Sequence, residues 1–169
     1  MTLEEAIKTA INYETKVRGV YQEAVDKATD DKGRKVFTVL RDEEQGHLDY
    51  LAERHAEWKK SGHVTAAKLG TVIPSKQKIA EGIKNAKKNV AAPDYAVELD
   101  MLKKALALEL ETGNFYKKMV AQLDAEGQAM FRRFVEIEDG HYAIVQAQMD
   151  AISGNGFWFD SMEFNLEMG

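Results

Sequence analysis

Apolar residues recur along most of this chain at alternating spacings of three and four positions, the pattern of helices that bury one face. The pattern predicts four long helices, at residues 2–28, 31–61, 94–123 and about 128–153. Residues suited to helix ends stand at several of these boundaries: Thr2 with Glu5, Asp30 or Asp31, Gly62 and Gly154. The chain is therefore predicted to be all-α.

Residues 62–93 interrupt the pattern with glycine, proline and mixed polar residues, and they predict a long crossing connection. After Ser75, apolar residues return at helical spacing and indicate one short amphipathic helix: Ile79, Ile83, Ala86 and Val90. A connection of this length lets the second and third long helices run parallel rather than as a hairpin. The expected architecture is a four-helix bundle over residues 1–153.

One glutamate interrupts the apolar stripe near the middle of each long helix, where an apolar residue is expected: Glu14, Glu44, Glu109 and Glu138. In the second and fourth helices a histidine follows three positions later, His47 and His141, on the same helix face. The midpoints of packed helices lie at similar heights, so all six side chains should converge.

The two halves of the chain repeat this arrangement. The stripe glutamates of the first and third helices are 95 positions apart, and the two Glu-x-x-His motifs are 94 apart. Tyr21 and Tyr116 each follow their own helix's glutamate by seven positions. The repeat predicts two similar half-sites that face each other.

A buried, unpaired carboxylate costs several kcal/mol of desolvation, and no lysine or arginine interrupts the stripes beside these four. Two divalent cations would neutralise all four carboxylates. Shared protons would neutralise the carboxylates only in part, and they would not explain the regular spacing of the glutamates and histidines. Iron or manganese suits this donor set best, and zinc also fits. The symmetric assignment gives one ion Glu14, Glu44 and His47 and the other Glu109, Glu138 and His141, with Glu44 and Glu138 as the bridges.

Other side chains admit two interpretations. Tyr21 and Tyr116 either fill the core or donate a hydrogen bond to a ligand carboxylate from the second shell of the site. Asp49 and Asp139 either face solvent or orient a histidine.

Composition narrows the chemistry. The 169 residues contain no cysteine, which excludes thiolate catalysis and iron–sulfur clusters on this sequence. The net charge of −5 argues against nucleic acid as the main partner. No segment is apolar enough for a membrane span, and the acidic N-terminus is unlike a signal peptide, so we expect a cytoplasmic protein. Residues 59–93 hold eight lysines and one acid, either a solvated connector or a docking patch for an acidic partner.

The C-terminal tail, residues 154–169, is too aromatic for a disordered segment. We expect it to pack on the bundle or on a partner subunit, with Trp158 and Phe159 buried, in a homodimer.

The chain resembles the ferritin-like di-iron carboxylate superfamily, and more closely its rubrerythrin branch, over residues 1–153. The resemblance rests on Ala10-Ile11-Asn12-Tyr13-Glu14, Leu108-Glu109-Leu110-Glu111 and the two Glu-x-x-His motifs. It implies two iron ions held by Glu14, Glu44, His47, Glu109, Glu138 and His141. It also implies a non-haem di-iron peroxidase or oxidase that acts on peroxide or dioxygen in the response to oxidative stress.

Two departures from the rubrerythrin pattern matter. Rubrerythrins carry a cysteine-rich rubredoxin module, so here the electrons would come from an external donor such as a rubredoxin. They also carry a further glutamate one turn after the third-helix ligand, where this chain has Thr112, which argues against efficient peroxidase action. Two alternatives stay open: a ferroxidase or iron-handling protein, and a non-catalytic metal-stabilised bundle.

Overall fold

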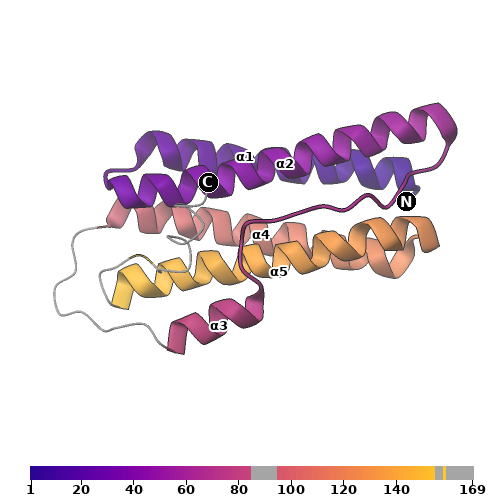
Figure 1. The fold of residues 1–169 in the computed structure, drawn as a ribbon. Coiled ribbons are helices and arrows are strands. Elements are labelled where there is room, and N and C mark those ends of the chain that lie inside the picture. Colours follow the sequence, from indigo (N-terminus) through magenta and orange to yellow (C-terminus); the bar gives the residue numbers. More distant parts are fainter. Residues whose placement is uncertain (85–94, 155–157, 159–169) are drawn as a thin grey trace.

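Four long helices dominate the computed structural model, which describes residues 1–84, 95–154 and 158 (Figure 1). They are α1 (Leu3–Lys27), α2 (Asp31–Ser61), α4 (Ala96–Gln122) and α5 (Ala125–Gly154). The short helix α3 spans Lys76–Lys84 and contains Ile79 and Ile83 of the predicted short helix, whereas Ala86 and Val90 lie outside the described residues. The described ranges contain no strand, so the predicted all-α class is confirmed.

The long helices pack as two antiparallel pairs, α1 with α2 and α4 with α5, and α1 also packs against α4. Figure 1 shows that α4 starts at the end of the molecule where α2 starts, so these two helices run in the same direction, as predicted from the long connection. None of the helices in the described ranges combines the length and apolarity that a membrane span needs.

Local sequence fixes most helix ends. Thr2 and Glu5 form the predicted capping box of α1, and Asp30 caps α2 by accepting a hydrogen bond from the Gly33 amide. Gly62 ends α2 in the left-handed conformation, with φ of 75°. The fourth long helix, expected from about residue 128, starts earlier: α5 begins at Ala125, where Asp124 accepts a hydrogen bond from the Gly127 amide in the first turn.

The apolar stripes meet in two hydrophobic clusters that lie on either side of the glutamates. One cluster contains Tyr21, Phe37, Leu102 and Val145, and the other contains residues such as Phe131. Along every long helix the candidate ligands fall between the residues of the two clusters. The result is one polar layer enclosed by apolar packing above and below.

Residues 62–75, which we call the strap, run between α2 and α5 and contact both (Figure 1). From α2, the Tyr50 hydroxyl donates to the carbonyl oxygen of Ala67 over 2.7 Å. From α5, the Arg133 guanidinium donates to the carbonyl oxygen of Leu69 over 2.9 Å. The strap therefore covers the seam between the two helices that carry the histidines.

Trp158 is buried within its own chain, against the start of α2. Its indole N–H donates to Asp30 over 2.9 Å, and its ring packs edge-on against Phe37 and Tyr95. A Cβ on Gly33 would lie 2.5 Å from the indole ring, so glycine makes room for it. Phe159 and most of the rest of the tail lie outside the described residues, and the homodimer stays a prediction.

Candidate metal centre

Each long helix brings one glutamate into the polar layer: Glu14 from α1, Glu44 from α2, Glu109 from α4 and Glu138 from α5. Their exposed fractions are 0–2%, and those of His47 and His141 are 1% and 0%. All six residues that the sequence singled out are therefore buried together.

The histidines face the glutamates through Nδ1. His47 Nδ1 lies 3.3 Å from a Glu44 oxygen and 3.4 Å from a Glu14 oxygen. His141 Nδ1 lies 2.9 Å from Glu44 and 3.6 Å from Glu109. The two imidazole rings stack, with centroids 5.1 Å apart. The Glu-x-x-His spacing thus delivers one imidazole nitrogen from each motif to the shared cluster.

The six predicted ligands form two groups that could each hold one metal ion, and Glu43, His47 and His141 form a third group in the described residues. Within a group, the atoms lie within 4.8 Å of one another. One group contains Glu14, Glu44, His47 and Glu138, and the other contains Glu44, Glu109, Glu138 and His141. Glu44 and Glu138 belong to both groups, as expected for carboxylates that bridge. The cluster can therefore hold metal.

The cluster leaves polar atoms unsatisfied. Within the described residues, each of the four glutamates has a buried carboxylate oxygen without a hydrogen-bond partner, and both His47 ring nitrogens lack one. Buried polar atoms are rarely left unpaired, since each costs about 1–3 kcal/mol. Carboxylate oxygens and imidazole nitrogens are donors for iron, manganese or zinc, so bound cations would satisfy these atoms.

Proton sharing distributes the charge when no metal neutralises the cluster. Burial and the nearby charges of Glu14 and Glu109 raise the pKa of Glu44 to about 8. Burial and the same two charges hold the pKa of Glu138 well above its usual range. Burial would lower the pKa of His47, but the adjacent Glu14 and Glu44 raise it to about 10.

Glu14 and Glu109 are the two carboxylates of the cluster whose pKa values are lowered rather than raised. Burial, the largest single influence, would raise the pKa of Glu14, but the charge of His47 and the hydrogen bonds with Glu44, His47 and Tyr116 together lower it to about 2. The pKa of Glu109 is likewise lowered, since the hydrogen bond and charge of His141 and the hydrogen bonds with Glu138 and Tyr21 together outweigh burial. Metal binding to this site therefore competes with protons on at least two carboxyls and two imidazoles.

Both tyrosines donate to a candidate ligand, but across the molecule rather than along their own helix. The Tyr21 hydroxyl of α1 donates to Glu109 of α4 over 2.6 Å. The Tyr116 hydroxyl of α4 donates to Glu14 of α1. This reciprocal pair ties α1 to α4 at the level of the cluster and leaves the second oxygen of each glutamate for a metal.

Glu43 contacts a candidate ligand but was not predicted from the sequence to belong to the site. Its Oε2 lies 3.2 Å from His141 Nε2, the ring nitrogen that faces away from the cluster. Asp49 and Asp139, considered for this role, contact Gln45 and Lys117 instead. In the sequence, a role for Glu43 is indicated by its place directly before Glu44. Its contact with His141 depends on how α2 and α5 lie relative to each other.

The other two histidines lie outside the site. His55 contacts Glu4 over 3.2 Å, and the exposed His63 contacts Glu126 over the same distance. Neither shares a candidate ligand group with the six clustered residues.

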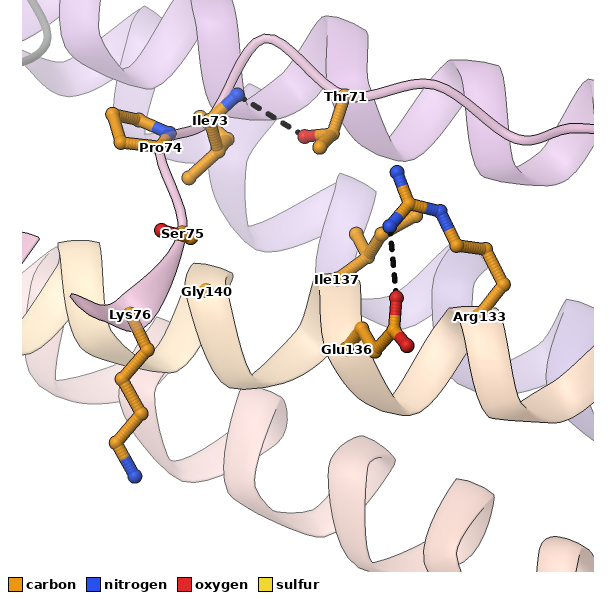
Figure 2. A pocket seen from close by; sticks show the side chains of 9 residues that line it. All are labelled: Thr71, Ile73, Pro74, Ser75, Lys76, Arg133, Glu136, Ile137 and Gly140. Atoms are coloured by element: carbon orange, nitrogen blue, oxygen red, sulfur yellow. Dashed lines mark hydrogen bonds and ion pairs between the residues drawn. The ribbon is translucent and has the colours of Figure 1, made fainter. Parts of the chain in front are cut away.

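Two openings flank the site. One encloses about 210 Å³ and reaches Glu109 and Glu138, with Lys76, Lys117 and Asp139 among the residues at its walls. The other encloses about 370 Å³ between the strap and α5 and is lined by none of the six residues (Figure 2). The first opening therefore reaches two of the candidate ligand carboxylates from outside the bundle.

Comparisons of this chain with protein families, with curated proteins and with solved structures find no match. The resemblance to rubrerythrins stays a prediction from the quoted motifs.

Proposed function

We propose that this protein is a di-iron oxidoreductase of the rubrerythrin type, built on a ferritin-like four-helix bundle. It reduces hydrogen peroxide or dioxygen with electrons from a separate donor. The observation that carries the proposal is that Glu44 and Glu138 belong to both ligand groups, which favours two ions side by side. Two redox-active ions bound there would supply the two electrons that cleaving the oxygen–oxygen bond of peroxide requires.

The protein's own residues support this chemistry by holding the candidate ligands in place and by limiting which molecules reach them. Tyr21 and Tyr116 hold Glu109 and Glu14 in place, so these ligands are preorganised before metal arrives. The opening of about 210 Å³ beside Glu109 suits a small oxidant better than a bulky organic substrate. The apolar clusters on both sides keep water from the layer.

Residues 1–169 contain no cysteine to hold an iron–sulfur or rubredoxin-type site, so the proposal assigns electron supply to a redox centre outside them. A rubredoxin is the donor that the proposal favours. The excess of lysines in the sequence of residues 59–93 would suit an acidic donor.

One observation favours an iron-handling alternative. Thr112 lies one turn after Glu109 and is fully buried, and its hydroxyl has no hydrogen-bond partner in the described residues. A hydroxyl there replaces the further carboxylate expected in an efficient peroxidase. A ferroxidase, for which ferrous iron is the substrate, needs no such residue.

The first test is metal content. Metal-free protein loaded with ferrous iron without oxygen should bind two ions per chain, one for each ligand group. Glu44→Gln and Glu138→Gln should each lose at least one ion, because each removes a shared ligand. Glu111→Gln is the matched control, since Glu111 is exposed on the same helix as Glu109. Wild-type protein that binds one ion or none would reject the proposal.

The second test is the reaction. Stopped-flow mixing should show the ferrous protein oxidised faster by about one equivalent of peroxide than by dioxygen. Steady-state peroxide consumption should then require added reduced rubredoxin. Faster oxidation by dioxygen, with ferrous iron consumed well beyond two ions per chain, would favour the ferroxidase instead.

A further inference from the structure

The two halves of the site repeat in sequence, but their histidines have different surroundings. His141 presents Nδ1 to the cluster and Nε2 to the Glu43 carboxylate, 3.2 Å away. His47 also presents Nδ1 to the cluster, yet its Nε2 has no hydrogen-bond partner within the described residues. Of the two candidate ligand histidines, only His141 therefore has a carboxylate within hydrogen-bond distance of its Nε2 in the described residues.

Sequence explains the difference. Glu43 directly precedes Glu44 on α2, and the corresponding position on α5, before Glu138, is Ile137. Ile137 is 3% exposed and belongs to an apolar cluster. Both halves of the sequence therefore contain a Glu-x-x-His motif, but only the first half has a glutamate directly before it.

The strap holds Glu43 in place. The Val72 amide donates to Glu43 Oε1 over 2.8 Å, and the Thr71 hydroxyl donates to Oε2 over 2.6 Å. Thr71 also accepts from the Ile73 amide over 3.1 Å, which fixes its hydroxyl (Figure 2). Three donors, including His141, thus surround one carboxylate that is 8% exposed.

Gly140, the residue before His141, lets the strap come this close. A Cβ at Gly140 would lie 3.3 Å from the Pro74 carbonyl oxygen, and Figure 2 shows this residue directly beside the strap. The corresponding Gly46 on α2 has nothing within 4 Å of its position. The strap therefore supports the His141 half of the site and not the His47 half.

We propose that Glu43 is a positioning residue for His141, and that it makes the two metal positions unequal. The position formed by Glu44, Glu109, Glu138 and His141 fills first, and the one formed by Glu14, Glu44, His47 and Glu138 fills second. This inference rests on the proposed two-metal site.

The physical reason lies in the hydrogen bond. When Nε2–H donates to Glu43, the lone pair of His141 is left on Nδ1, toward the metal, and the ring cannot rotate away. The carboxylate also makes the imidazole a more basic ligand. Outer partners of this kind are typically worth 10–100-fold in metal affinity. His47 must select its tautomer and orientation as the metal binds.

The experiment is a titration of metal-free, full-length protein with Mn²⁺ against a chromophoric chelator. Wild-type protein should show two unequal binding steps. Glu43→Gln should weaken the tighter step by about 10–100-fold and leave the weaker step unchanged. Thr71→Val, which keeps Glu43 but removes a donor that holds it, should weaken the same step by less. Asp49→Asn is the control that should bind as wild type, since Asp49 contacts Gln45 and lines neither opening.

A spectroscopic readout separates positioning from a general loss of structure. Protein with nitrogen-15-labelled histidine receives less than one equivalent of Co²⁺ as a paramagnetic probe. The resonances of His141 should shift before those of His47 in wild type. In Glu43→Gln the preference should disappear while the melting curve of the metal-free protein stays cooperative.

Several outcomes would overturn the inference. Two unequal steps that survive Glu43→Gln, or two steps that weaken equally, would show that Glu43 does not position His141. A third Mn²⁺ that Glu43→Gln removes would make Glu43 a ligand, in the group that it forms with His47 and His141. A wild-type protein that binds no metal would instead reject the proposed function.

Discussion

At the scale of single residues, Glu98 and Glu109 are buried carboxylates on the same helix that differ in their hydrogen-bond partners. One oxygen of Glu98 accepts three hydrogen bonds, from the Thr29 amide, the Thr29 hydroxyl and the Asp30 amide, at 2.7–2.9 Å. Burial would raise the pKa of Glu98, but these donors lower it. Glu109 instead faces other carboxylates and a histidine. Glu98 therefore ties α4 to the turn between α1 and α2, and Glu109 is left for a cation.

Metal binding should release protons, and its affinity should rise with pH. Glu44 has a pKa of about 8 and His47 one of about 10, so both are protonated at neutral pH. The pKa values of Glu138 and His141 are also held well above their usual ranges, which favours the protonated form of both groups. Two ions that take all four groups should displace up to four protons. Calorimetry in two buffers of different ionisation enthalpy measures this number, and affinity should fall as the pH drops from about 8 to about 6.

Glu98→Gln is the control for that measurement, because Glu98 is buried but belongs to none of the ligand groups. Its proton release on metal binding should equal that of wild type. An affinity that is constant over this pH range would contradict the protonation pattern of the cluster.

At the scale of elements, glycines in the helices differ in what surrounds them. Gly19 of α1 has nothing within 4 Å of the place where a Cβ would stand, whereas Gly33 of α2 has the Trp158 ring at 2.5 Å. Gly33 thus lets the tail residue Trp158 dock on the first turn of α2. The sequence alone assigns the same helix-weakening effect to both glycines.

The same substitution should therefore have opposite effects at these two positions. Gly19→Ala should stabilise the protein by about 0.5–1 kcal/mol, because alanine loses less backbone entropy in a helix. Gly33→Ala should destabilise it by about 1–3 kcal/mol, because the new methyl group overlaps a rigid ring. Urea denaturation measures both changes in the free energy of unfolding.

Tryptophan fluorescence reports directly whether Gly33→Ala displaces Trp158 from α2. In a Trp58→Phe background, emission from Trp158 should shift to longer wavelength on Gly33→Ala as the indole becomes hydrated. Unchanged emission together with unchanged stability would show that Trp158 does not dock at Gly33.

At the scale of the whole molecule, the polar layer joins four helices through carboxyl and imidazole groups that share protons when no cation is present. The apolar clusters on both sides hold the layer together. Metal that binds only the folded protein adds RT ln(1 + [L]/Kd) to the free energy of unfolding, about 2.7 kcal/mol at 100 times Kd.

The gain in melting temperature on metal binding should grow with pH. Without metal, the raised pKa of Glu44 stabilises the folded state fully below pH 4.5, and this contribution is lost as pH rises through about 8. The contribution of His47 is lost similarly between pH 6.5 and about 10. With metal, fewer protons compete at higher pH. Thermal melts with Mn²⁺ or with a chelator should therefore differ more at about pH 8 than at about pH 6, and equal differences would contradict this linkage.

The sequence by itself determined the helices and the membership of the cluster. Helical periodicity places residues three and four apart on one face, so a glutamate within an apolar stripe had to be buried. The offset of 94 or 95 positions between the halves then indicated that the buried groups would meet.

Only the tertiary structure decided which side chains meet across helices. Spacing along one helix gives the face of a residue, but not the rotation of the helix or the neighbour that it faces. For that reason Tyr21 bonds Glu109 rather than its own helix's glutamate, and Glu43 reaches His141 on α5. The strap has no periodic pattern, so its path across the seam between α2 and α5 follows from contacts between residues far apart in the chain. Those contacts make two halves that are alike in sequence different in structure.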